Sequence, residues 1–190
     1  MDARMPRALI VYSSSHGQTR EVAYRLATRL HRQAFRVVVA DTGDAVPLPP
    51  PAGFDLVIIG SRIHFGRHSS SVIAYLHHYR KQLEATATAF FSVSMAAANG
   101  GDDPNGYLAA TFERIGWRPP VAVAIAGALK YRRYNFLLRY VMKRIALAAG
   151  HSTDTSHDHV YTDWSRVDDF ADRALALCRG ESAQSPRVQN

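Results

Sequence analysis

The stretch ALIVYSSSHGQT, residues 8–19, decides the fold, because it joins an apolar strand to a helix through a loop of small polar residues. Its first five residues are apolar and two of them are β-branched, which predicts a strand. The loop brings four hydroxyl side chains and one glycine to a helix N-terminus. Free backbone N–H groups, the helix dipole and short hydroxyl donors favour a terminal phosphate there. The predicted phosphate loop consists of Ser13, Ser14, Ser15, His16, Gly17, Gln18 and Thr19.

A serine-rich loop can also cap its helix without binding a ligand, and this alternative stays open. Competing phosphate motifs are absent from the sequence, which has no GxGxxG, no Gly-x4-Gly-Lys-Ser/Thr and no acidic pair after the first strand. The single cysteine, Cys178, lies far from the loop, so cysteine-based phosphatase chemistry is excluded as well. The strand directly before the loop favours phosphate binding over simple capping.

Short apolar runs alternate with segments of helical period along the rest of the chain. Helices are predicted from about Thr19 to Gln33, from about Ser70 to Leu83 and around Val167–Cys178, whose periodicity makes Cys178 a core residue. This alternation predicts an α/β fold with a doubly wound, five-stranded parallel sheet and helices on both faces. The prolines of Pro47–Pro51 predict an irregular crossover in place of a helix. The five strands are predicted at Ala8–Tyr12, Arg36–Ala40, Phe54–Gly60, Ala89–Ser94 and Val121–Gly127.

Composition bounds the organisation of the protein. With 190 residues and 47% hydrophobic side chains, we expect a single domain over residues 1–179 and a disordered tail over residues 180–190. One cysteine excludes an intramolecular disulfide, which favours a cytoplasmic protein whose redox chemistry requires a cofactor. No window approaches the roughly 20 apolar residues of a membrane-spanning helix. The net charge is +7, and residues 114–153 contain eight Lys or Arg and no Asp or Glu, which favours anionic partners.

Five further segments extend the pattern beyond the phosphate loop: SRIHFG at 61–66, FFSV at 90–93, WRP at 117–119, IAGALKY at 125–131 and VYTDW at 160–164. The loop resembles that of flavodoxins, and the segments together resemble the bacterial flavodoxin-like protoporphyrinogen oxidases, the menaquinone-dependent protoporphyrinogen IX dehydrogenases, over residues 8–177. The resemblance implies a flavodoxin-like fold and an FMN enzyme of heme biosynthesis. Such an enzyme oxidises protoporphyrinogen IX to protoporphyrin IX and reduces menaquinone or ubiquinone. It also implies a cytoplasmic protein, peripherally associated with the inner face of the cell membrane, with no nucleic-acid partner.

In a doubly wound sheet the ligand lies beyond the carboxyl ends of the strands, where we expect three loops to meet. The second loop, Ser61–His68, would run beside the flavin ring. The side chains of Ile63, His64 and Phe65 can cover one face of that ring. His64 is also the candidate proton donor, and the alternative is that it is an ordinary loop residue. By resemblance to flavodoxins, the backbone at Gly66 would lie near the flavin N5. The third loop, Ser94–Asp103, lacks an aromatic lid, so one ring face would be open to substrate. Predicted cofactor residues in these two loops are Ser61, Arg62, Ile63, His64, Phe65, Gly66, Ser94, Met95, Ala96, Asn99, Gly100 and Asp102.

Residues 128–159 are expected to form a basic insertion after or within the fifth strand, with a helix from about Asn135 to Ala148. On a helical wheel one arc is apolar and the other combines cations with aromatic side chains. This pattern suits an anionic membrane surface, a tetrapyrrole that carries carboxylates, or a quinone; alternatively the apolar arc packs on the domain. Candidates for substrate or membrane contacts are Arg62, Arg67, Lys130, Arg132, Arg133, Arg139 and Lys143.

Three alternatives remain beside the oxidase. His151, Asp154, His157, Asp158 and His159 match no strong zinc pattern, and a polar loop explains them, so no metal is predicted. A flavodoxin electron carrier is disfavoured because flavodoxins are typically acidic, whereas an NAD(P)H-dependent quinone reductase needs no separate motif. His16 stands where an acidic residue is common in the oxidases, and the sequence is compatible with a homo-oligomer.

Overall fold

The computed structural model describes residues 4–99, 103, 106–129 and 159–180. Five parallel strands form the sheet in the order β2-β1-β3-β5-β6, and a short strand, β4, pairs antiparallel with β3. The parallel α/β sheet that the sequence predicts is confirmed. The bounds of these strands are β1 Arg7–Ser13, β2 Arg36–Asp41, β3 Leu56–His64, β4 Arg67–His68, β5 Ala87–Ser94 and β6 Val121–Ala126.

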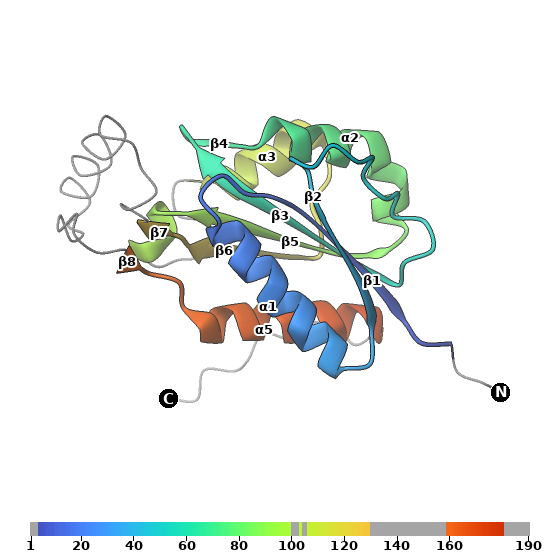
Figure 1. The fold of residues 1–190 in the computed structure, drawn as a ribbon. Helices are drawn as coiled ribbons and strands as arrows, with labels where there is room; N and C mark the ends of the chain where they lie inside the picture. The colour runs from blue at the N-terminus through green and yellow to red at the C-terminus, as the bar shows by residue number, and fades with distance from the viewer. Residues whose placement is uncertain (1–3, 100–102, 104–105, 130–158, 181–190) are drawn as a thin grey trace, which may run out of the picture.

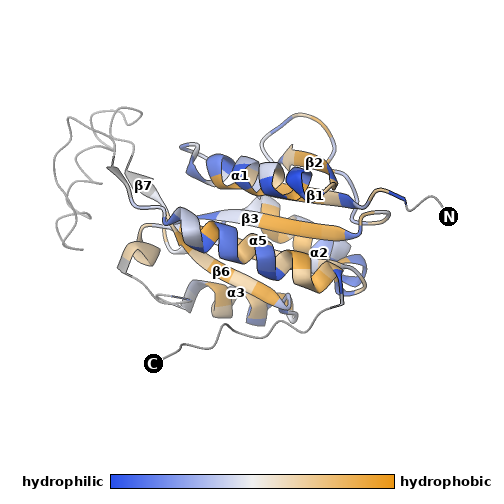
Figure 2. Cartoon of the chain, turned by 90° about the horizontal axis from the view of Figure 1, so that it is seen from below, coloured by the Kyte–Doolittle hydropathy of each residue, from blue (hydrophilic) through white to orange (hydrophobic). Residues whose placement is uncertain are grey.

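Helices cover both faces of the sheet (Figure 1). One core packs α1 (Gln18–Arg32) and α5 (Trp164–Cys178) against alternate strand residues such as Ile10 and Ile58. The other packs α2 (Ser70–Glu84) and α3 (Tyr107–Ile115) against their neighbours in the strands, such as Leu9 and Ile59. The central strands are therefore buried on both faces, which is why they are continuous apolar runs in the sequence. In Figure 2 much of β3 is coloured as hydrophobic.

The predicted helices at 19–33 and 70–83 are confirmed to within one residue at each end. The last helix begins at Trp164, because the Asp163 side chain accepts from the backbone N–H groups of Ser165 and Arg166 and caps it. Cys178 is only half-buried at the rim of the core, and burial raises the pKa of its thiol.

The crossover from β2 to β3 is irregular, as the prolines predict. Residues 42–55 contain turns, bends and irregular chain and no helix. The segment is held to α2 by the Tyr75 hydroxyl, which donates to the Pro49 carbonyl at 2.8 Å. Proline lacks a backbone donor, so the chain here is fastened by a side chain in place of a helical hydrogen-bond ladder.

Two features of the fold differ from the sequence prediction. The third strand does not end at Gly60; it continues to His64 and turns back into β4, so that the sheet has a sixth strand and the predicted loop Ser61–His68 is a hairpin. The helix α3 had no counterpart in the prediction, although Leu108, Phe112 and Ile115 are spaced at four and three residues and are all buried.

Beyond β6 the chain enters a small separate sheet, in which β7 (Ala128–Leu129) pairs antiparallel with β8 (His159–Val160). Most of the predicted insertion, including its helix at 135–148, lies outside the described residues, as does the tail from residue 181. Among the helices that the structure describes, none combines the length and apolar character needed to cross a bilayer.

Candidate functional site

The predicted phosphate loop lies between the end of β1 and the first turn of α1. Gly17 is the N-cap residue of α1 with a φ of 91°, a left-handed conformation that glycine adopts without steric cost. No side chain caps the helix; the Ser14 hydroxyl instead accepts from the Gly17 N–H at 3.1 Å and closes the turn. Among the described residues these serines therefore do not act as side-chain caps of α1. The uncapped N–H groups of the first turn are the donors that an anion requires.

Gln18 and Thr19 point into the protein. Gln18 is 5% exposed, and its Nε2 donates to Thr162 Oγ1 at 2.8 Å, while Thr162 Oγ1 donates to the Ala126 carbonyl at 2.7 Å. The Gln18 Oε1 is buried and has no hydrogen-bond partner among the residues that the structure describes. Through Thr162, the Gln18 side chain ties the start of α1 to the end of β6, and Thr19 is 2% exposed.

The two serines at the strand ends, Ser13 and Ser61, face the opposite side of the sheet. Ser13 Oγ donates to Ser69 Oγ at 3.0 Å, and Ser61 Oγ accepts from the Ser69 N–H at 3.1 Å. Both hydroxyls therefore hold the start of α2 to the sheet. Of the predicted hydroxyl ligands, Ser14, which is half-buried, and Ser15, which is exposed, remain at the loop surface.

The β3–β4 hairpin projects beyond the sheet next to this loop. Ile63 pairs with His68 and His64 with Arg67, leaving a two-residue tip at Phe65 and Gly66. Their φ values of 48° and 72° are those of a type I′ turn. Phe65 is 86% exposed, and its ring lies 4.2 Å from that of the exposed His64. A positive φ at a non-glycine residue costs about 1–2 kcal/mol, so the structure holds an apolar ring in water on strained backbone.

His68, which the sequence analysis missed, anchors this hairpin. The ring is 7% exposed; its Nδ1 lies 2.7 Å from Thr111 Oγ1 and its Nε2 lies 3.1 Å from Ser92 Oγ. The ring also packs edge-on against Phe90. Burial lowers the pKa of His68 to about 4, so the ring is neutral at pH 7. No sequence signal could have identified it, because a two-residue strand has no periodicity.

The third loop begins where β5 ends. Ser94 Oγ accepts from the Ala97 N–H at 3.3 Å, and the Ser94 carbonyl accepts from the Gly127 N–H at 2.9 Å. Met95 precedes a single 3₁₀ turn, Ala96–Asn99. Gly100 and Asp102 lie outside the described residues, whereas Asp103 binds the N–H groups at the start of α3. Because β1, β3 and β5 are adjacent and parallel, the three predicted loops meet at one edge of the sheet.

The predicted cationic contacts divide into two groups. Arg62 is half-buried in β3 and Arg67 is exposed in β4, both at this edge. Lys130, Arg132, Arg133, Arg139 and Lys143 lie outside the described residues. So do four of the five residues weighed as metal ligands, and in the parts that the structure describes no three His, Cys, Asp or Glu gather into a metal-binding group.

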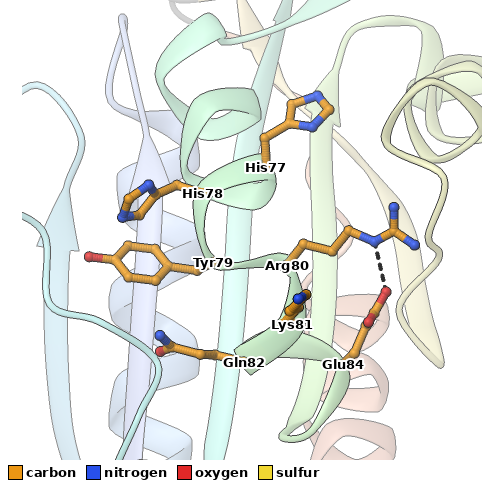
Figure 3. A pocket seen from close by; sticks show the side chains of 7 residues that line it. All are labelled: His77, His78, Tyr79, Arg80, Lys81, Gln82 and Glu84. Atoms are coloured by element: carbon orange, nitrogen blue, oxygen red, sulfur yellow. Dashed lines mark hydrogen bonds and ion pairs between the residues drawn. The ribbon is translucent and has the colours of Figure 1, made fainter.

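Two surface hollows lie away from the loops. One is on the second half of α2, where His78 packs on Tyr79 and Arg80 donates to Glu84 (Figure 3). The other runs along α1 beside Trp164 and Asp168. Neither hollow is lined by a predicted site residue. The positive charge of the second hollow is partly neutralised, because Arg25 forms an ion pair with Asp168 at 2.6 Å.

Known proteins resemble this chain in sequence and in fold. The Flavodoxin domain family matches residues 9–156. The chain is 33% identical over 168 residues to protoporphyrinogen IX dehydrogenase [quinone] of Escherichia coli K12, covering 87% of this chain and 92% of that protein. It is 32% identical over 181 residues to the protein of the same name from Leishmania major, covering 93% of this chain and 78% of that protein.

Solved structures agree on the fold alone. Oxidised flavodoxin 1 from Bacillus cereus superposes with a TM-score of 0.51 at 11% identity, covering 93% of this chain and 99% of that one. Rubredoxin oxygen:oxidoreductase from Desulfovibrio gigas superposes with a TM-score of 0.53 at 14% identity, covering 93% of this chain and 37% of that one. With an uncapped helix N-terminus and two further loops at one edge of a parallel sheet, the chain belongs to the flavodoxin domain family, among the protoporphyrinogen IX dehydrogenases [quinone].

Proposed function

We propose that this protein uses FMN to oxidise protoporphyrinogen IX to protoporphyrin IX and passes the electrons to a quinone, menaquinone or ubiquinone, in heme biosynthesis. The observation that carries the proposal is the uncapped first turn of α1, at the edge where β1, β3 and β5 end, in a chain 33% identical to a protoporphyrinogen IX dehydrogenase [quinone]. Full oxidation of the porphyrinogen removes six electrons, so it takes three two-electron cycles of a flavin.

The residues present fit FMN. A phosphate needs donors, and the loop offers the N–H groups of the first turn of α1 with the Ser14 and Ser15 hydroxyls beside them. The flavin ring would lie between the β3–β4 hairpin and the third loop, with Ile63, His64 and Phe65 on one side and the backbone of Ser94–Asn99 on the other. When bound, the flavin supplies a two-electron acceptor; the protein supplies orientation and a partly dry environment.

The hairpin side chains define what this chain contributes to catalysis. His64 is exposed beside the proposed ring position and can exchange a proton with water or substrate, so it is the candidate proton donor. Phe65 offers an apolar face to the ring. Arg67, which is exposed two residues beyond Phe65, is positioned for a substrate carboxylate, and the cations of the insertion are proposed for the same role.

The excess of Lys and Arg over Asp and Glu in residues 114–153 suits both partners of the reaction. Protoporphyrinogen carries carboxylates, and a quinone resides in a membrane whose cytoplasmic leaflet is anionic. We propose that residues 128–159 dock at such a surface, so that a cytoplasmic protein of one domain, residues 1–179, works peripherally at the membrane. Liposome co-sedimentation of the native chain and of the Arg139→Glu/Lys143→Glu variant tests this part, and equal binding would remove the proposed role of the insertion.

Anaerobic stopped-flow mixing tests the reaction itself. Oxidised holoprotein is mixed with protoporphyrinogen IX, and the loss of oxidised flavin absorbance is followed; rapid bleaching is expected. Bleaching by NADPH and none by protoporphyrinogen would point to an NAD(P)H-dependent quinone reductase. No bleaching by either donor would point to an electron carrier, and a protein that stays colourless after incubation with FMN would refute the flavin site.

A further inference from the structure

Arg62 occupies a position next to the phosphate loop that the proposed function leaves unexplained. In the sheet register Ser61 pairs with Ser13, the last residue of β1, so Arg62 stands one residue past the point where the phosphate loop leaves the sheet. On its other side Arg62 pairs with Val93 of β5. It therefore lies between the first and third loops.

The pleat of the strand directs Arg62 toward the face that carries α1. Its parallel partner Val93 belongs to the core under α1 and α5, and register partners in adjacent strands point to the same face. The neighbour before it, Ser61, faces α2 through its bond to Ser69, as alternation requires. Arg62 thus shares a face with the first turn of α1, where Gln18 is buried.

The hydrogen bonding of Arg62 is incomplete. Its Nε is buried and has no acceptor among the described residues, and no ion pair to Arg62 is found there. A buried guanidinium donor without an acceptor destabilises the fold, so its presence indicates an anionic group that completes it. Arg20, the cation in the first turn of α1, is already engaged, since it donates to the Tyr12 hydroxyl at 3.1 Å and to Asp41 at 3.2 Å.

We propose that Arg62 donates to the phosphate of FMN, and that it thereby determines selectivity for FMN over riboflavin; this rests on the flavin site proposed above. A phosphate monoester carries a charge of about −1.5 to −2 at pH 7 and strong acceptor oxygens. The Arg62 guanidinium supplies one further donor and a fixed positive charge, which the hydroxyls and N–H groups of the loop lack. Arg62 is on this basis a cofactor ligand and not a contact for porphyrinogen carboxylates.

The test compares two flavins that differ only in the phosphate. Deflavinated full-length protein is titrated with FMN and with riboflavin, and the Kd values are read from the quenching of flavin fluorescence. Arg62→Met keeps the apolar stem and removes the charge; Arg36→Met, an exposed arginine at the opposite end of the sheet, is the matched control. We expect Arg62→Met to weaken FMN binding by about tenfold or more and to change riboflavin binding by less than about twofold. The control should change neither Kd.

Added salt gives a second readout. Raising the KCl concentration should weaken FMN binding more in the native protein than in Arg62→Met, because screening acts on a charge that the variant lacks. If Arg62→Met does not fold, as judged by circular dichroism, the same comparison is made with Arg62→Lys, which must lower the affinity for FMN relative to riboflavin. Equal weakening of both flavins, or no change in either, overturns the proposal. A native protein that binds neither flavin instead refutes the proposed function.

Discussion

Gly60 provides the sharpest test of how the sheet supports the site, because it lies two residues before Arg62 under an aromatic ring. A Cβ built at Gly60 would come 2.5 Å from Phe91 Cε1 and 2.7 Å from Cε2, whereas ordinary contacts begin near 3.4 Å. In Gly60→Ala the ring must therefore move by about 1 Å or more. Phe91 is fully buried against Phe170, so it has no free space to occupy.

Overpacking of this kind costs about 1–3 kcal/mol, and we expect about 2 kcal/mol for Gly60→Ala. For a chain of this size the melting temperature should fall by about 4–8 °C. Phe91→Leu alone should cost about 1–2 kcal/mol, because it removes buried ring atoms. It also makes room for the new methyl group, so the double variant should be more stable than the sum of the single changes predicts, by about 1 kcal/mol or more.

Urea denaturation followed by circular dichroism gives the four free energies of unfolding that this cycle needs. Additive effects of the two substitutions would refute the reasoning, since they would mean that the methyl group at residue 60 does not meet the ring at residue 91. A Gly60→Ala variant with native stability would refute it as well.

Three further predictions concern the loops. Gly17→Ala places a Cβ at a φ of 91°, so the free energy of unfolding in urea should fall by about 1–2 kcal/mol. The Kd for FMN, measured by the fluorescence titration described above, should rise. An unchanged stability and an unchanged Kd would show that the turn tolerates another conformation. Folding lowers the pKa of His68 from 6.5 to about 4. Between these pH values the ring is protonated in the unfolded chain and neutral in the folded protein. The free energy of unfolding should therefore fall as the pH drops from about 6.5 to 4, by about 3 kcal/mol at most. His68→Gln should lose this part of the pH dependence, and equal slopes in the two proteins would contradict the assignment. Phe65→Asn places at the positive φ a residue that tolerates it, so the free energy of unfolding in urea should stay the same or rise by up to about 1 kcal/mol. A clear loss of stability would show that the contact between the Phe65 and His64 rings outweighs the backbone strain.

The parts of the site that could be predicted from sequence are those set by local chemistry. A loop of serines and one glycine between an apolar run and a helix pattern predicts a phosphate-type loop at a helix N-terminus, because strand, turn and helix preferences all act within a dozen residues. The prolines between β2 and β3 predicted the irregular crossover for the same reason. By contrast, the hairpin at Phe65–Gly66 has no asparagine or aspartate at its first tip residue, so the usual signal for a two-residue turn is missing.

The sequence by itself determined that this chain builds a parallel α/β sheet with a phosphate-type loop after its first strand, since apolar periodicity and turn chemistry are local properties. Only the tertiary structure decided the face of the sheet to which each candidate side chain points. Ser13 and Ser61 face α2, while Arg62 faces α1, and His68 is buried through contacts with β5 and α3. The physical reason is the pleat: successive strand residues point to opposite faces, and the side on which each lies depends on where neighbouring strands place the register.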